Sequence, residues 1–389
     1  MAQSVPAAAA HEHTRLAWRT WVPWALVVLA AVIGLVAALN VWVKRQALST
    51  DNFTNASSQL IENEQIRGAL SVYLVNQLYA NVDVSAALEQ RLPPQVKGLA
   101  PTIAGALQQP AVQATDALLA RPRIQALWRE SVRRAHEAFL ALLNGKHNLL
   151  VSTNGQVVLD LRPLVEQLAA QFGLSGERLK QLPPDAGQIV ILKGNQLQTA
   201  RRSVKVVRAL SYFLLFLVLA LFAAAIWLAD GRRRKLLMGC GVSVLIVGLI
   251  VLVVRRYAGN YLVDALTNNP EQKHPISAVW AIETQLLRNV GINAVVYGIG
   301  IMFAAWIAGT SRAATWIRRQ LAPTMRSHPV VIYAAVALAL FLVLISGPTD
   351  AQRIYPLLIL FAFAFVGTEV LRRQTEREFP AAGGGELGT

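Results

Sequence analysis

The chain has 389 residues, of which 54% are hydrophobic and only 15% are charged, and its formal net charge is +15. Soluble domains carry about 25% charged residues, so this composition excludes an ordinary soluble protein of this length. The positive charge lies mainly at the ends of apolar stretches and does not form one continuous basic patch. We therefore expect a protein whose partner is the lipid bilayer, with no nucleic-acid partner.

Six apolar stretches are long enough to cross a membrane, because about 20 helical residues rising 1.5 Å each span roughly 30 Å of hydrocarbon. None contains Asp, Lys or Arg, and their single acidic residue, Glu369, lies in the last turn of the sixth. The predicted spans are 21–43, 209–228, 236–254, 290–308, 330–347 and 354–371. The predicted domains are an N-terminal tail (1–19), a first transmembrane helix (20–43), an outer domain (44–208), a five-helix membrane domain (209–371) and a C-terminal tail (372–389).

We expect the first span to be retained as a signal anchor. Its apolar run is longer than the 7–15 residues typical of a cleaved signal peptide. Trp18, Trp21 and Trp24 lie near its start. Tryptophan is enriched at membrane–water interfaces, which favours a helix that stays in the bilayer.

Basic residues at the borders of the spans predict the orientation. Short cytoplasmic loops are enriched in Lys and Arg, and the loop between the second and third spans carries four of them at 232–235. An even number of spans then places both termini in the cytoplasm and the outer domain outside the plasma membrane. The basic residues at 44–45 and 201–208 oppose this orientation, since they would face outward. The border residues are Lys44, Arg45, Arg201, Arg202, Arg232, Arg233, Arg234, Lys235, Arg255, Arg256, Arg372 and Arg373.

From residue 49 to residue 143 the outer domain is predicted to be helical. Ser49, Thr50 and Asp51 are favourable N-cap residues. Prolines at 93, 94, 101, 110 and 122 are expected to divide the region into short helices. Apolar residues recur at three- and four-residue spacing, which predicts helices that pack around a core of their own. The first of these positions are Leu60, Ile61, Ile66, Leu70, Leu74, Val75 and Leu78.

The composition changes at Asn148, where extended runs begin. The segments 149–153 and 156–161 flank Asn154-Gly155, a strong signal for a two-residue hairpin turn. Because a lone hairpin is marginally stable, we expect the run at 188–193 to pair with it. A helix is predicted between them at 162–172. The expected fold class is thus mainly α, with six transmembrane helices and a helical outer domain carrying a small β-sheet (α+β).

After Gly194 no helix breaker occurs before Gly231, so the second span is predicted to begin as a stalk above the membrane. The loop at 255–289 contains Tyr257, Tyr261 and Trp280. We expect this loop either to lie on the membrane surface or to dock against the outer domain.

The sequence offers no motif for catalysis or metal binding. Cys240 is the single cysteine, so a disulfide within the chain is excluded, and no HExxH, phosphate-binding GxxxxGK[ST] or GxSxG motif occurs. We expect no catalytic residue, no cofactor, no metal and no enzyme activity.

Gly241 and Gly248 lie seven residues apart in one span, and Gly291 and Gly298 repeat this spacing in the next. Small residues on one face predict close helix packing, with a hinge as the alternative.

Four segments carry a resemblance to a known group: Trp21-Val22-Pro23-Trp24, 42–48, 182–191 and 371–375. In these segments the chain resembles a family of multi-pass integral membrane proteins of actinobacteria that has no assigned function. The resemblance implies a bacterial envelope location. In layout alone, one helix, a large outer domain and further helices are also similar to permeases of ABC-type exporters.

We interpret the chain as a non-enzymatic envelope protein whose outer domain binds a partner or envelope component through residues 46–200, while its helices anchor or relay. The alternative is the permease subunit of an ATP-driven exporter. That role needs a cytoplasmic helix that docks on an ATPase subunit, and 313–321, with Trp316 and Ile317, is the candidate. A membrane enzyme is the third hypothesis, disfavoured because no acid–base constellation is visible.

Overall fold

The computed structural model describes residues 8–144, 156–160, 188–229, 231–327 and 329–346, with scattered positions between 365 and 375. The chain forms two compact units. Unit 1 comprises Met1–Leu39, Tyr212–Arg255 and Leu287–Thr389. Unit 2 comprises Asn40–Ser211 and Arg256–Leu286. The second unit therefore includes a later segment that the predicted outer domain (44–208) did not contain.

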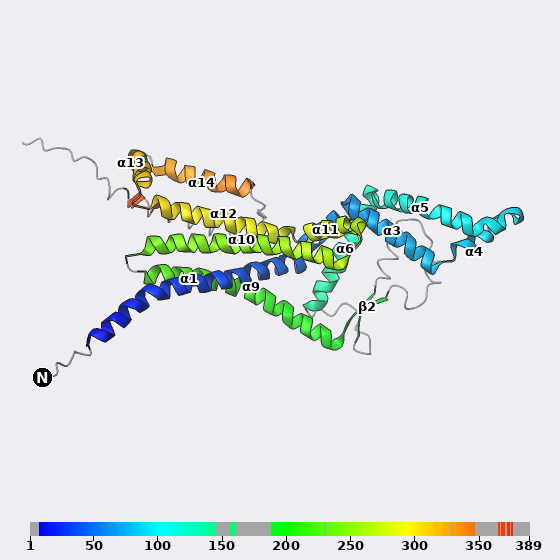
Figure 1. Cartoon of the computed structure of the whole chain (residues 1–389), viewed down its shortest axis with the longest axis horizontal. Helices are drawn as coiled ribbons and strands as arrows, with labels where there is room; N and C mark the ends of the chain where they lie inside the picture. The colour runs from blue at the N-terminus through cyan, green and yellow to red at the C-terminus, as the bar shows by residue number, and fades with distance from the viewer. Residues whose placement is uncertain are drawn as a thin grey trace, which may run out of the picture. The chain divides into compact units, whose positions relative to one another are not determined.

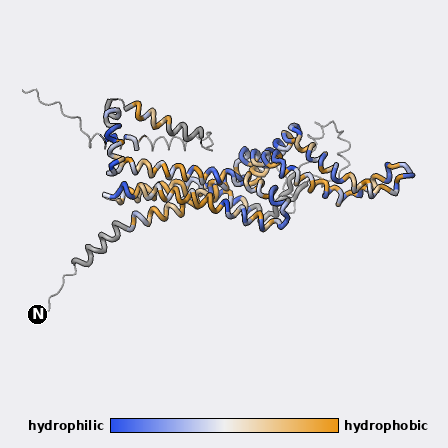
Figure 2. The backbone as a smooth tube through the Cα atoms, turned by 45° about the horizontal axis from the view of Figure 1, so that its top comes forward, coloured by the Kyte–Doolittle hydropathy of each residue, from blue (hydrophilic) through white to orange (hydrophobic). Residues whose placement is uncertain are grey.

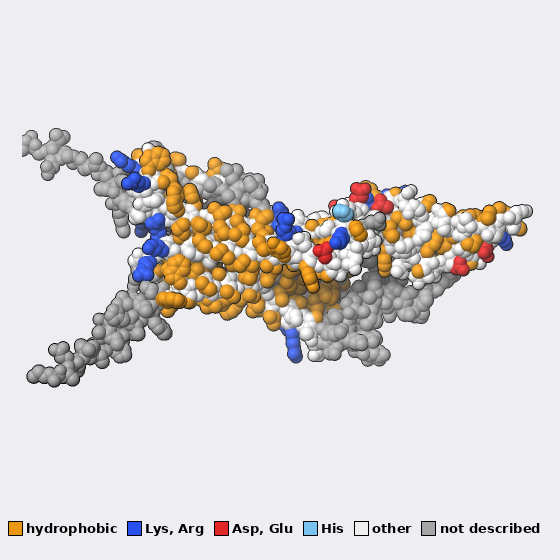
Figure 3. Space-filling view, in the orientation of Figure 1, with side chains coloured by type: hydrophobic (Ala, Val, Ile, Leu, Met, Phe, Trp, Pro, Cys, Tyr) orange, Lys and Arg blue, Asp and Glu red, His pale blue; other side chains and the backbone are white. Residues whose placement is uncertain are grey.

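Long apolar helices make up most of unit 1 (Figure 1). Figure 2 shows that the backbone of these helices is mainly hydrophobic. In Figure 3 apolar side chains cover their visible face. The helices that contribute to this unit are α1 (Ala8–Ala47), α9 (Gly194–Leu228), α10 (Arg233–Leu266), α12 (Gln285–Ile307), α13 (Arg312–Ser327) and α14 (Pro329–Ser346).

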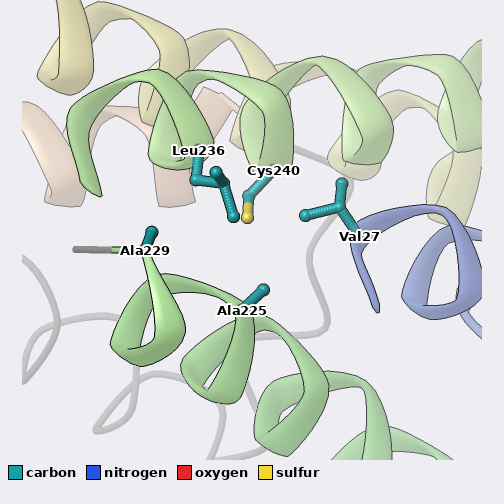
Figure 4. Packing of buried hydrophobic residues seen from close by; sticks show 5 residues of the cluster. All are labelled: Val27, Ala225, Ala229, Leu236 and Cys240. Carbon is teal, nitrogen blue, oxygen red and sulfur yellow. The ribbon is translucent and has the colours of Figure 1, made fainter. Parts of the chain in front are cut away.

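Three of these helices meet in a small buried cluster (Figure 4). Val27 of α1 packs against Ala225 of α9 and against Leu236 and Cys240 of α10. Gly231 begins the path into α10 with a φ of 73°, a left-handed conformation that glycine adopts without steric cost. The alanines at this contact let the helices approach closely, as expected where lipid rather than water surrounds the bundle.

Four helices are long and apolar enough to cross a membrane, and the prediction of six spans is wrong for the described part of the chain. The four are Trp21–Leu48, Gln198–Leu228, Arg233–Leu266 and Gln285–Ile307. The fifth predicted span coincides with α14, which is not among these four helices, and the residues that follow Ser346 lie outside the described part of the chain. Apart from a few positions, the sixth lies outside the described residues.

Unit 2 is built from short helices, and three of them begin at a side-chain cap, of which Ser49 was predicted from the sequence. Ser49 caps α2 (Thr50–Glu62), Asn63 caps α3 (Glu64–Asn81) and Asp83 caps α4 (Val84–Glu89). A 3-10 helix, η1 (Pro94–Leu99), leads into α5 (Ala100–Leu119), and α6 (Pro122–Leu143) follows. The prediction of helices from 49 to 143 is confirmed. Pro110, however, lies inside α5 and does not divide it.

Two short strands are the extended elements in the described part of unit 2. β1 (Gln156–Asp160) pairs with β2 (Gln188–Lys193) in an antiparallel ribbon, with an irregularity between Val157 and Val158. The prediction of an α+β outer domain is wrong, because two strands do not make a sheet layer and helices form the rest of the described unit. The predicted run at 149–153, the Asn154-Gly155 turn and the helix at 162–172 lie outside the described residues.

The predicted absence of a break after Gly194 is confirmed, since α9 runs unbroken from Gly194 to Leu228. The loop at 255–289 is mostly helical. It comprises the end of α10 and the separate helix α11 (Pro270–Glu283).

Candidate partner-binding surface of unit 2

The base of unit 2 is the contact between α2 and α6. His136 of α6 is buried there, and its ring stacks on Phe53 of α2 with centroids 4.3 Å apart. Its Nε2 lies 3.2 Å from the Ala47 carbonyl oxygen, and its Nδ1 lies 3.2 Å from Thr50 Oγ1. A carbonyl can only accept, so Nε2 carries the proton and the Thr50 hydroxyl donates to Nδ1. Burial lowers the pKa of His136, which favours the neutral imidazole that this pair of hydrogen bonds requires.

Polar contacts join the same two helices further along. Trp128 Nε1 donates to Ser57 Oγ at 3.0 Å, and Arg129 Nε donates to Ser58 Oγ at 3.1 Å. Arg129 also pairs with Glu62 across 3.1 Å. Since both charged side chains are about half exposed, this ion pair orients the helices more than it stabilises them.

The helix α11 packs against the other helices of this unit, which agrees with the second of the two positions expected for the 255–289 loop. It packs against α3 and α2, and Gln46 Nε2 donates to Glu283 Oε2 at 2.7 Å. Near the end of α10, a Cβ added to Gly259 would lie 2.4 Å from Trp280 Nε1, so the missing side chain makes room for the indole. Lys273 of α11 reaches Asp264 of α10 at 2.7 Å.

From this base α3, α4, η1 and α5 form a helical hairpin, here called the arm (Figure 1). Polar contacts follow the seam between its two long helices at three levels. Arg67 Nε donates to Asp116 Oδ1 at 2.9 Å, Gln108 Nε2 donates to Asn76 Oδ1 at 2.9 Å, and Tyr79 Oη donates to the Ala104 carbonyl at 3.0 Å. The descending order of the α5 partners shows that the two helices run antiparallel.

The side chains buried along the arm are small: Ser71, Val75, Ala100 and Ala104. Small residues bring two helix backbones close together but leave little volume for a core. The expectation that the apolar stripe of this region packs into a core of its own therefore fails for part of α3. Leu74 is 41% exposed and Leu78 is 51% exposed.

We call the exposed set Leu74, Leu78 and Val82 the arm ridge. Leu74 and Leu78 lie four residues apart and thus share one face of α3. On α5, Leu107 and Leu118 are also exposed, and Figure 3 shows apolar side chains along the arm. A cluster of large apolar residues facing solvent is typical of an interaction site, whereas single exposed leucines are ordinary.

The basic border residues predicted from the sequence have several different environments. Arg201 Nε donates to the Leu142 carbonyl in unit 2, and Arg234 Nε donates to the Ala305 carbonyl in unit 1, both at 3.1 Å. Arg372 and Arg373 both pair with Glu369. The exposed members are Arg202, Arg232, Arg233, Lys235 and Arg256, and the partly buried ones are Lys44, Arg45 and Arg255.

The four predicted packing glycines lie at one contact between α10 and α12. A Cβ on Gly248 would lie 2.7 Å from the Gly291 carbonyl oxygen, and a Cβ on Gly298 would lie 2.8 Å from that of Gly241. Contacts this short exclude any side chain unless the helices separate. The polar Asn40 also has a helix-to-helix contact, because Ser211 Oγ donates to its Oδ1 at 2.6 Å.

Comparisons of the chain with protein-family models, with curated proteins and with solved structures found no match. Among the described residues no group of three or more His, Cys, Asp and Glu side chains lies close enough to hold a metal ion.

Proposed function

We propose that the protein is a non-enzymatic, multi-pass protein of a bacterial plasma membrane whose unit 2 binds another protein through the arm ridge. The observation that carries this proposal is the exposure of Leu74, Leu78 and Val82 on the arm. The contact between its two long helices buries mainly small side chains and leaves these three residues in solvent. Four membrane-length helices are compatible with the anchoring role. The resemblance to actinobacterial membrane proteins supports an envelope location.

The chemistry of the arm ridge favours a protein over an envelope glycan. Leu and Val offer neither the hydrogen bonds that sugar hydroxyls need nor the flat aromatic face on which a sugar ring stacks. They suit a partner that presents an apolar helix face or groove. The charged pairs Arg67–Asp116 and Arg129–Glu62 lie elsewhere on the unit and fix its shape.

We further propose that both termini are cytoplasmic and unit 2 is outside. The loop joining α9 to α10 and the segment after α12 are both rich in Arg. With four spans, both segments lie on the same side of the membrane as the N-terminus. Four is an even number, as six is, so both termini are again placed on one side. Positive charge in short loops favours the cytoplasm.

Affinity purification of the tagged full-length chain from its host tests the role of the arm ridge. A partner protein should co-purify in a fixed ratio and be lost from the Leu74→Glu/Leu78→Glu variant. The control is Ala69→Glu/Ala80→Glu, which adds the same charge at exposed positions of α3. Ala80 lies about 200° around the helix from Leu78. Equal loss from both variants, or equal retention by both, would contradict the proposal.

The exporter permease is the second candidate, and it rests on one helix. The predicted ATPase-docking segment 313–321 does lie in a helix, α13, and Trp316 is exposed on it. A stoichiometric nucleotide-binding ATPase in the same purification, retained by the arm-ridge variant, would favour this candidate.

A further inference from the structure

We propose that α13 lies on the membrane surface, where Arg312 and Arg319 bind the headgroups of anionic lipids. This inference goes beyond the proposed function and does not depend on a partner of unit 2. It rests on the two faces of α13, on its attachment to the end of α12, and on the charge of the surrounding sequence.

The helix has an apolar face and a basic face. Ala313 and Ile317 lie four residues apart on one face, and exposed Trp316 lies at the boundary between this face and the arginines. Arg312 and Arg319 lie seven residues apart on another face, and both are exposed. A helix with aliphatic residues on one side, Arg on another and Trp at the boundary between them is typical of a helix that lies in the plane of the interface.

Arg318 holds α13 at the end of a membrane-length helix. Its side chain is only 1% exposed. Its Nη1 donates to the Gly309 carbonyl oxygen at 2.6 Å and also to the carbonyl of Ile307, the last residue of α12. From α10, Arg234 Nε donates to the carbonyl of Ala305, two residues before Ile307. Two guanidinium groups thus donate to carbonyls that the end of α12 leaves without helical partners. Their positive charge also interacts favourably with the negative C-terminal end of the α12 dipole.

This attachment sets the depth of α13. Residues 308–311 alone join it to α12. With the Arg318 bonds in place, α13 cannot leave the level at which α12 ends. That level is the membrane border, because α12 is long and apolar enough to span. Lys and Arg side chains gather at this end of unit 1 in Figure 3.

The positive charge of the sequence around α13 favours anionic lipid as the ligand of this helix. No Asp or Glu occurs from residue 284 to residue 349, whereas Arg312, Arg318, Arg319 and Arg326 do. The exposed guanidinium groups of Arg312 and Arg319 suit lipid phosphate oxygens, which accept two hydrogen bonds from one Arg. Each Arg near an anionic bilayer strengthens binding about fivefold.

The test uses the full chain in lipid nanodiscs. Cys240→Ala removes the single cysteine, and Ala313→Cys provides a site on the apolar face for an environment-sensitive fluorophore. Discs of phosphatidylcholine alone are compared with discs containing phosphatidylglycerol. We expect the label to be protected from a water-soluble quencher in the anionic discs and quenched by lipids carrying a spin label.

The Arg312→Gln/Arg319→Gln variant should lower the ratio of inserted to water-exposed label about 25-fold in anionic discs. The control Arg91→Gln/Lys97→Gln removes the same charge from exposed positions of unit 2 and should leave the ratio unchanged. A label exposed to water in both kinds of disc would overturn the inference. So would protection that appears only when a co-purified ATPase is added, since that result assigns the apolar face of α13 to a protein.

Discussion

Arg67 of α3 donates a hydrogen bond of 2.9 Å to Asp116 of α5, although 49 positions separate the two residues. This contact closes the end of the arm nearest α2 and α6. The Arg67 side chain is 13% exposed and that of Asp116 is 34% exposed, so solvent screens the pair only in part. The pair therefore differs from the exposed ion pairs on α6, such as Arg133–Glu137.

Replacing Asp116 should loosen the arm. Asp116→Ala removes the carboxylate from the partly buried Arg67 guanidinium and leaves it the Glu62 carbonyl as an acceptor, which costs about 1–3 kcal/mol. Hydrogen exchange of the α3 and α5 amides should accelerate accordingly. Glu137→Ala breaks an exposed pair and should cost no more than about 0.5 kcal/mol. Equal exchange rates in the two variants would show that Arg67–Asp116 does not hold the arm.

His136 makes the stability of unit 2 depend on pH. Its pKa is lowered by burial, an effect that the hydrogen bond to the Ala47 carbonyl and the charge of Glu137 partly oppose. A depressed pKa means that the fold prefers the neutral ring. The stabilisation is therefore complete above the unfolded pKa of about 6.5 and is lost as the pH falls toward the lower folded value.

The measurement is the denaturation midpoint of the purified protein at pH 7.5 and at pH 5.5. The midpoint should fall at the lower pH in the wild type. His136→Gln cannot titrate, so its midpoint should change less between the two conditions. A wild-type midpoint that rises at pH 5.5 would contradict the assigned neutral form.

Gly248 should be intolerant of even a methyl group. A Cβ there would lie 2.7 Å from the Gly291 carbonyl oxygen and 2.8 Å from the Val295 amide nitrogen. Gly248→Ala must push α10 and α12 apart, at a cost of about 1–3 kcal/mol. Gly300 in the same pair of helices is the matched control, because its Cβ would meet nothing within 4 Å. Unfolding in mixed micelles should show a loss for Gly248→Ala and none for Gly300→Ala.

Cysteine labelling tests the proposed orientation. In the Cys240→Ala background the chain has no cysteine, and Gln77→Cys and Arg232→Cys place one at exposed positions of unit 2 and of the loop that joins α9 to α10. A maleimide that cannot cross membranes should label position 77 in intact cells. It should label position 232 only after permeabilisation. The opposite pattern would place unit 2 in the cytoplasm.

Local sequence signals predicted the helices well. Ser49 and the periodic apolar residues after it located α2 and α3, and the unbroken run after Gly194 located α9. Hydropathy located the four membrane-length helices. Of the two further apolar stretches, 330–347 forms α14, which is not among the four, and most of 354–371 lies outside the described residues. The hairpin signal at Asn154-Gly155 suggested a sheet where the described chain forms a ribbon of two strands.

The candidate surface was harder to predict, because it depends on which apolar residues the fold fails to bury. Leu74, Val75 and Leu78 fit the same helical stripe in the sequence, yet Val75 lies in the seam while the two leucines face solvent. The signal that separates them is the partner helix: Ala100 and Ala104 of α5 permit a close approach and leave no room for leucine. Likewise, the sequence drew attention to the 255–289 loop, but the packing of α11 on α3 could not be predicted from it.

Photo-crosslinking in living cells tests most directly whether the arm ridge binds a protein. A benzophenone amino acid replaces Leu78 in one variant and Ala80 in the other, which lies on the opposite side of α3. We predict one crosslinked product of a different protein from position 78 and none from position 80. The same products from both positions, no product from either, or crosslinks only to a second copy of this chain would contradict a partner-binding arm.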